Sequence, residues 1–168
     1  DRTRMVALSW VGFSSGFRCD LKSIVQFAHS RKILVFLDAI QGLGAFPVDV
    51  KQTPVDFVAA DGHKWMLGPE GAGMLYIRNQ HLERLNPINV GWNSLAGRAF
   101  DPKSAELKSS AARFEGGSAS IAGMVGWGSS LEMLLEVGAN RPENLIEQSI
   151  LENIAMLTEL LTSAGFLV

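Results

Sequence analysis

A lysine stands just after a short apolar run, in a stretch whose residue types and spacing permit amine chemistry. Residues 57–60 are Phe-Val-Ala-Ala, and residues 61–65 are Asp-Gly-His-Lys-Trp. The apolar run predicts a buried strand and the glycines at 62, 68 and 71 predict tight turns, so Lys64 lies just past a strand end. A desolvated lysine is a nucleophile able to form a Schiff base, because burial disfavours its charged form. Taken alone, however, the triplet His-Lys-Trp is better explained by an ordinary surface loop.

An aspartate ends a second apolar run upstream. Residues 33–37 are Ile-Leu-Val-Phe-Leu, Asp38 follows them directly, and Gly42 breaks the pattern. In open α/β sheets the ligand crevice lies outside the carboxyl ends of the strands, so we expect Asp38 and Lys64 to face one crevice. Pyridoxal 5'-phosphate (PLP) requires such a pair: an amine that attaches it and an acid that keeps its ring nitrogen protonated. Gln41, three positions beyond the aspartate, is placed to donate to the ring oxygen.

Several motifs recur in order along the chain and together resemble one known family. They are Asp38-Ala39-Ile40-Gln41, Pro47-Val48-Asp49-Val50, Val55-Asp56-Phe57 and Asp61-Gly62-His63-Lys64-Trp65 followed by Gly68-Pro69 and Gly71. With this spacing the chain resembles the class V aminotransferases, fold type I PLP enzymes that include cysteine desulfurases, isopenicillin N epimerase-like proteins and, more distantly, kynureninases. The resemblance extends from about Val6 to Gly138, and the combination is far more specific than any single motif.

The resemblance implies a role for each matching residue. Lys64 resembles the Schiff-base lysine, Asp38 the partner of the pyridine nitrogen, and Gln41 the contact to the ring oxygen. His63 resembles a ligand on the phosphate side of the cofactor. In the signature of residues 113–118, the hydroxyl that matches Ser118 contacts the PLP phosphate of the neighbouring subunit. Ser118 or Ser120 is also a natural N-cap for the next helix, and the two roles are compatible.

Two further segments bear on the implied site. Many desulfurases have a serine two residues before the histidine, where it helps to hold the phosphate, whereas this chain has Asp61. Because a carboxylate beside a phosphate is electrostatically unfavourable, we keep Asp61 as a residue that orients His63. Gly91-Trp92-Asn93-Ser94 and Gly97 resemble the segment that reaches the neighbouring subunit's active-site mouth, and Trp92 is equally explained as a packed aromatic.

The order of the apolar runs predicts an α/β fold with three α-β-α layers and a mixed, mostly parallel sheet. Strands are expected over residues 4–13, 33–38, 57–60 and 73–78, the last antiparallel to at least one neighbour, with a short extended piece over 47–50. Helices are expected from the Asp20 N-cap to about Ser30, over 119–137, and from Arg141-Pro142-Glu143 to Ala164, with Gly165 as C-cap and a strand beginning at 166–168. Asp49 and Asp56 are expected to be turn or capping residues with solvent neighbours.

Composition excludes some classes of function. The 168 residues are 47% hydrophobic and 19% charged, with a net charge of −2 and no long run of either sign, which argues against binding to nucleic acid or to a membrane surface. No apolar stretch approaches the length of a membrane span, and no leader pattern opens the chain. The single cysteine, Cys19, is consistent with a reducing compartment, so we expect a cytoplasmic protein. Cys19 lies upstream of Lys64, whereas the reactive cysteine of desulfurases lies well downstream of the lysine.

Residues 1–168 resemble only the central part of the family's large PLP-binding domain, without its N-terminal segment and its C-terminal small domain. The resemblance implies a homodimer with shared active sites that acts on an amino acid, with cysteine desulfurase-like activity as the first hypothesis. Epimerase-like or aminotransferase activity of the same family is the alternative. A noncatalytic α/β fragment, in which Lys64 is an ordinary loop residue, stays open as a third interpretation.

Overall fold

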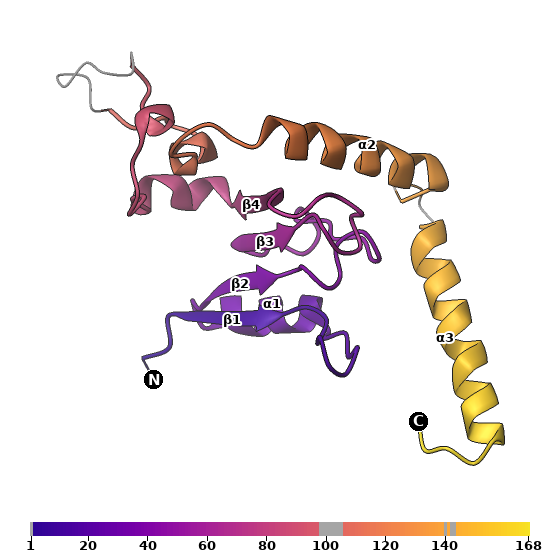
Figure 1. The fold of residues 1–168 in the computed structure, drawn as a ribbon. Helices are drawn as coiled ribbons and strands as arrows, with labels where there is room; N and C mark the ends of the chain where they lie inside the picture. Colours follow the sequence, from indigo (N-terminus) through magenta and orange to yellow (C-terminus); the bar gives the residue numbers. More distant parts are fainter. Residues whose placement is uncertain (1, 98–105, 140, 142–143) are drawn as a thin grey trace.

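A computed structural model describes residues 2–97, 106–139, 141 and 144–168 of the chain. Four strands form one sheet in the order β1 (Met5–Ser9), β2 (Leu34–Asp38), β3 (Phe57–Asp61) and β4 (Gly73–Ile77) (Figure 1). The first three strands are parallel, and β4 runs antiparallel to β3. The expected mixed, mostly parallel sheet is therefore confirmed.

Helix α1 (Leu21–Ser30) covers one face of this sheet. It begins at the expected N-cap, because the carboxylate of Asp20 accepts a hydrogen bond from the Ser23 N–H at 3.1 Å. Val25 and Ala28 of α1 share a core cluster with Val35 and Leu37 of β2, and all four are buried. Side chains alternate across a strand, so Phe36 and Asp38 point to the opposite face.

Short 3-10 helices cover part of that opposite face. Phe57 and Ile77 form a second core cluster with Leu82 of η1 (Asn79–Arg84). Phe114 of η3 (Ala111–Phe114) packs against the same cluster, and a third short helix, η2, spans Trp92–Ser94. The cover is incomplete toward the carboxyl ends of the strands, where a hollow remains.

Two long helices complete the chain. Helix α2 (Ile121–Val137) begins at Ser120, whose side chain accepts from the Gly123 N–H, and ends at Gly138, whose φ of 116° suits glycine. Helix α3 (Leu145–Ser163) begins at Asn144 and contains no buried residue. In Figure 1, α3 lies apart from the sheet, on the right of the view.

Several expected boundaries differ in the structure. The first strand is shorter than residues 4–13, because the chain turns at Gly12 and closes on itself through the Val11–Arg18 bridge. Residues 47–50 and 166–168 form no strand. Helix α3 starts later than Arg141, while Pro142 and Glu143 lie outside the described residues; it ends with Ala164 as C-cap and Gly165 at a φ of 87°. Among the helices described here, none is both long enough and apolar enough to cross a membrane.

The prediction for Asp56 was wrong. Asp49 does cap a turn, accepting from the Lys51 N–H at 2.8 Å, but Asp56 is only 1% exposed. It lies at the start of β3 and is enclosed by α1, β2 and η1, so its partners are side chains and backbone groups of the protein.

Candidate functional site

The carboxyl ends of the three parallel strands bring the predicted acid and the lysine turn to one edge of the sheet. Ser9 at the end of β1 pairs with Asp38 at the end of β2, and Asp38 pairs with Ala59 of β3. Asp61 follows Ala59 by two positions and therefore lies on the same face as Asp38. The lysine turn, residues 62–72, leaves the sheet directly after Asp61.

Asp38 lines an open hollow on this face. The hollow has a volume of about 630 Å³ and is bounded by Phe36, Ala59, Asp61 and Glu115 among others. One oxygen of Asp38, Oδ1, accepts a hydrogen bond from the Ile40 N–H at 3.0 Å, which fixes the carboxylate at the strand end. A volume of several hundred Å³ is typical of sites for small molecules and cofactors.

The lysine turn is closed by its own backbone. The Gly62 N–H donates to the Ala72 carbonyl at 2.7 Å, and the Gly68 N–H donates to the Gly62 carbonyl at 2.8 Å. Within this loop the Leu67 N–H donates to the Lys64 carbonyl at 2.9 Å, which fixes the backbone that carries the lysine. The turn confirms the predicted place of Lys64 just beyond the strand.

The Lys64 side chain is half-buried and directed toward the loop after β1. Its Nζ lies 5.7 Å from the centroid of the Phe13 ring. Because β2 lies between β1 and β3, a contact from the turn after β3 to the loop after β1 passes the end of β2, which is Asp38. Among the described residues that line the hollow, Asp38 is present and Lys64 is not. The amine and the acid therefore lie at the same edge of the sheet, but only the acid borders the hollow.

Asp61 and His63, which precede Lys64 in the sequence, form a half-buried pair. His63 Nδ1 lies 3.3 Å from Asp61 Oδ2, within ion-pair distance, but the geometry is not that of a hydrogen bond. Asp61 Oδ1 and His63 Nδ1 are both inaccessible to solvent and have no hydrogen-bond partner in the described part of the chain. Such orphaned atoms are costly, and they favour a polar ligand beside this pair.

The other two predicted residues lie apart from these contacts. Gln41 is half-buried in the turn after β2, and Ser118 is exposed ahead of α2. Within the described ranges, no hydrogen bond joins either side chain to Asp38 or Lys64. Of the two serines considered as N-cap, Ser120 takes that position, which leaves the Ser118 hydroxyl unengaged by the helix.

Two segments of this chain resemble family segments that reach the active site of a neighbouring subunit: residues 91–94 and residues 113–118. They lie side by side in the structure. A Cβ on Gly91 would fall within 1.8 Å of the Gly116 carbonyl oxygen, so only glycine permits this approach. The Asn93 side chain donates to the Gly117 carbonyl at 3.4 Å, and the Ser94 hydroxyl donates to the Glu115 carbonyl at 3.4 Å. Sequence reasoning had not joined these segments, nor had it placed Glu115 at the hollow.

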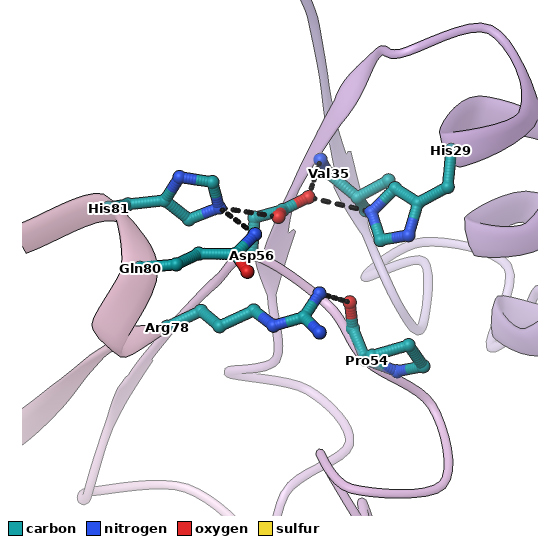
Figure 2. A network of polar contacts seen from close by, with 7 residues as sticks. All are labelled: His29, Val35, Pro54, Asp56, Arg78, Gln80 and His81. Atoms are coloured by element: carbon teal, nitrogen blue, oxygen red, sulfur yellow. Dashed lines mark hydrogen bonds and ion pairs between the residues drawn. The ribbon is translucent and has the colours of Figure 1, made fainter. Parts of the chain in front are cut away.

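A polar network that sequence reasoning missed surrounds Asp56 (Figure 2). Asp56 Oδ2 lies 2.9 Å from His29 Nε2 and accepts from the Val35 N–H at 2.8 Å, while Oδ1 lies 2.7 Å from His81 Nε2. Burial acts to raise the pKa of the Asp56 carboxyl, but the Val35 N–H and the two histidines outweigh it and lower the pKa. The sequence does contain one sign of this network: Asp56 directly precedes a buried strand, and a carboxylate buried there needs partners within the protein.

Cys19 is half-buried near the end of β1, as expected of a small structural residue. Its Sγ lies 3.9 Å from the Ser9 carbonyl oxygen, and burial raises the pKa of the thiol. A raised pKa disfavours the thiolate that a nucleophilic cysteine requires. Metal binding is a separate question: among the residues that the structure describes, no group of three or more His, Cys, Asp or Glu side chains is placed to hold a metal ion.

Comparisons of sequence agree with the motifs. A family model described as Aminotransferase class-V matches residues 1–166. The cysteine desulfurase CsdA of Escherichia coli is 34% identical over 85% of this chain, and a probable cysteine desulfurase of Methanothermobacter thermautotrophicus is 33% identical over 84%. In both alignments the matched region is 35% of the relative, so the chain spans about a third of the length of the curated relatives that it matches.

Solved structures show the same relationship. The apo cysteine desulfurase of Thermococcus onnurineus NA1 aligns with a TM-score of 0.83 at 26% identity, over 95% of this chain and 38% of that one. E. coli CsdA aligns with a TM-score of 0.79 at 32% identity, over 96% and 39%. The cystine C-S lyase C-DES, solved with its product cysteine persulfide, aligns with a TM-score of 0.74 at 30% identity, over 81% and 36%. By its motifs, its fold and these matches, the chain belongs to the aminotransferase class-V family.

Proposed function

We propose that this chain is the cofactor-binding core of a PLP-dependent enzyme of the cysteine desulfurase type, with residues 1–168 forming part of its large domain. The observation that carries the proposal is the lysine turn at the sheet edge where β2 ends on Asp38. Support comes from the relatives: CsdA is a cysteine desulfurase, and a C-DES mutant has been solved with glycine covalently linked to its PLP cofactor.

The residues of the edge suit PLP at three positions and conflict with it at one. Asp38 offers a carboxylate oxygen that is not used by the Ile40 N–H, Lys64 offers a primary amine, and His63 offers a half-buried imidazole. Asp61 is unsuited to a direct phosphate contact because both groups are anionic. Its Oδ2 lies 3.3 Å from His63 Nδ1, so Asp61 orients the imidazole instead.

Each side chain then has a defined task. Bound PLP supplies an electron sink for the bonds at the substrate's Cα. Asp38 holds a proton at the ring nitrogen, Gln41 donates to the ring oxygen, and His63 binds on the phosphate side. Lys64 Nζ holds the cofactor and moves the Cα proton of the amino acid. Ser118, free of the helix cap, donates to the phosphate of a neighbouring subunit.

Cys19 does not serve as the sulfur acceptor in this proposal. Desulfurase chemistry transfers sulfur from cysteine to an enzyme thiol and leaves alanine, so the acceptor must readily form a thiolate. The pKa of the Cys19 thiol is raised by its burial, and Cys19 precedes β2 rather than following Lys64. We therefore assign the acceptor thiol to a part of the enzyme beyond this chain.

The experiment is a product analysis with the full-length enzyme. Incubated with PLP, L-cysteine and an excess of a dithiol reductant that cleaves the enzyme persulfide, it is expected to release alanine and sulfide in equal amounts, and Lys64→Ala abolishes both. Lys51→Ala, at an exposed lysine in the loop before β3, is the matched control and leaves turnover unchanged. Loss of L-configuration without sulfur release would instead identify the epimerase-like alternative, and keto-acid formation the aminotransferase. Absence of any reaction with any amino acid would favour a noncatalytic protein.

The proposal includes a homodimer in the cytoplasm. Support comes from the close contact of Gly91 with Gly116. This contact joins the two segments, residues 91–94 and 113–118, that resemble intersubunit elements of the family. Full-length protein is expected to elute as a dimer in size-exclusion chromatography with light scattering. Ser118→Ala should weaken PLP binding without changing the elution volume; a monomer that binds PLP normally would contradict the Ser118 assignment.

A further inference from the structure

One face of α2 lies directly on the lysine turn. Residues 123, 126, 127 and 130 recur at helical spacing and meet the turn in succession. A Cβ on Gly123 would lie 3.5 Å from Ala72 Cβ, and a Cβ on Gly126 would lie 3.6 Å from Pro69 Cγ. These ordinary contact distances show that the helix backbone itself packs against the turn.

Trp127 fills the space between the two ends of the loop that carries Lys64. A Cβ on Gly62 would lie 3.0 Å from Trp127 Cε2, and a Cβ on Gly68 only 2.6 Å from Trp127 Cδ1. The indole is 6% exposed, and its Nε1 has no hydrogen-bond partner in the described ranges. Burying the indole N–H without a hydrogen-bond partner costs free energy. The two glycines leave room for the ring, and the ring sets the distance between α2 and the lysine turn.

Ser130 adds a directional contact at the non-glycine residue of the turn that has a positive φ. Leu67 has a φ of 54°, in the left-handed region that a branched side chain rarely adopts. The Ser130 hydroxyl donates to the Leu67 carbonyl at 2.7 Å, across 63 positions of sequence; the Gly126 carbonyl of α2 itself is a second, longer acceptor at 3.2 Å. The N–H of Leu67 in turn donates to the Lys64 carbonyl at 2.9 Å, so two hydrogen bonds connect α2 to the lysine backbone.

We infer that Ser130, together with Trp127, is a positioning residue for Lys64. This inference rests on the proposed function, since it concerns the placement of the amine that holds PLP. The Ser130 hydroxyl holds Leu67 in its left-handed conformation, Leu67 holds the Lys64 carbonyl, and the indole prevents the loop from collapsing toward the helix. The lysine therefore meets the cofactor in a turn that is already ordered.

The neighbouring serine supplies a matched control. The Ser129 hydroxyl donates only to the Val125 carbonyl at 3.3 Å, within α2 itself, and does not reach the turn. The variants are therefore Ser130→Ala, Ser129→Ala and Ser130→Thr, the last of which keeps a hydroxyl. All three are made in the full-length protein; each alanine variant removes one hydroxyl, whereas Ser130→Thr keeps the hydroxyl and adds a methyl group.

Two measurements are made on each variant. Hydrogen exchange of the protein without PLP is expected to show the Leu67 and Gly68 amides exchanging about fivefold faster in Ser130→Ala, as for the loss of one neutral hydrogen bond. The amides of α1 stay at wild-type rates, which separates a local effect from global destabilisation. PLP attachment, trapped with borohydride and located by mass spectrometry, is expected to be about fivefold slower at Lys64. Ser129→Ala matches wild type in both, and Ser130→Thr recovers most of the loss.

The outcomes distinguish this inference from the proposed function. Equal attachment rates in Ser130→Ala and Ser129→Ala would overturn the positioning role while leaving the PLP assignment intact. Unchanged exchange at Leu67 and Gly68 would overturn it as well, because the hydroxyl would then not hold the turn. If the wild-type protein attaches no PLP at Lys64, the proposed function fails and the positioning role fails with it, whatever the exchange rates show.

Discussion

At the scale of single residues, the buried carboxylate of Asp56 joins three parts of the fold. It contacts His29 of α1, the backbone of Val35 in β2 and His81 of η1, all within 3 Å. Removing one member of a buried polar network leaves the others without partners, which costs more than the hydrogen bonds themselves contribute. Without Asp56, the Val35 amide and His29 Nε2 would lose the partner described here, and His81 Nε2 would keep only the Gln80 side chain at 3.3 Å.

We therefore expect Asp56→Ala to lower the free energy of unfolding by about 3 kcal/mol, the usual order for a broken buried charged network. Asp49→Ala is the control, because its carboxylate caps an exposed turn and its loss is expected to be much smaller. Urea denaturation followed by circular dichroism measures both. Equal losses in the two variants would show that the Asp56 network does not stabilise the core.

The same carboxylate makes stability depend on pH in a defined direction. The pKa of Asp56 in the folded protein is below its ordinary value of 3.8, so its contribution is fully present above pH 3.8 and is lost as the pH falls through the native pKa. Between pH 5 and pH 3 the urea midpoint is expected to fall more steeply in wild type than in Asp56→Asn. Parallel curves for the two proteins would contradict the assignment.

These residues also show what sequence can and cannot predict. Asp38 at a strand end and Lys64 just beyond one were predicted correctly, because each follows an apolar run and that local pattern suffices to place a residue there. Asp56 has the same local signature, an acid beside an apolar run, but its role depends on His29 and His81, which are 27 and 25 positions away. Long-range pairs of this kind have no signal in one sequence.

At the scale of elements, Gly128 of α2 and Gly44 of the loop before β3 have opposite roles. Gly128 lies inside α2, and no described atom comes within 4 Å of the position that a Cβ would occupy, so this glycine serves no packing purpose in the chain. Gly44 has a φ of 99°, and a Cβ there would lie 2.5 Å from the Trp65 carbonyl oxygen. One glycine weakens its helix, whereas the other is required where the loop meets the lysine turn.

We expect Gly128→Ala to raise the free energy of unfolding by about 0.5 to 1 kcal/mol, because alanine favours the helix and meets no neighbour. Gly44→Ala is expected to lower it by more than about 1 kcal/mol, the cost of a left-handed alanine combined with a steric clash. Thermal denaturation of the two variants measures the difference. A destabilising Gly128→Ala would indicate that another part of the protein packs against that face of α2.

Helix ends could be predicted from local sequence, whereas strand pairing could not. The limits of α1 and α2 were predicted within two residues, because Asp20, Ser120 and Gly138 are strong local capping signals. The short extended piece over 47–50 is not part of the described sheet, and the strand expected to begin at 166–168 is not formed, since no strand of that sheet pairs with either segment. Sheet order and the packing of α2 on the lysine turn also depend on tertiary contacts, which no local pattern specifies.

At the scale of the whole molecule, the two C-terminal helices expose many apolar side chains. On α2, Ile121 is 75% exposed and Val125 65%, and on α3, Leu160 is 60% exposed. Apolar surface of this extent is uncommon on an isolated protein and is typical of surfaces that pack against other structure. The chain also covers only 35% of the CsdA sequence, so these faces have room for further contacts in such an enzyme.

The 168-residue chain by itself is therefore expected to bind the apolar dye ANS strongly. A double variant, Val125→Ser with Leu160→Ser, should reduce the fluorescence by at least about a third, because it removes one strongly exposed apolar side chain from each of α2 and α3. Fluorescence titration of both proteins at equal concentration measures this. No dye binding by the unaltered chain would show that these faces are covered by the chain's own contacts.

Whether Lys64 holds PLP is decided by trapping with borohydride followed by peptide mass spectrometry. The full-length protein, incubated with PLP and reduced, is expected to carry one pyridoxyl group on the peptide containing Lys64, and the group disappears in Lys64→Ala while Lys51→Ala retains it. A pyridoxyl group on another lysine in preference to Lys64, or an unmodified protein, would contradict the account.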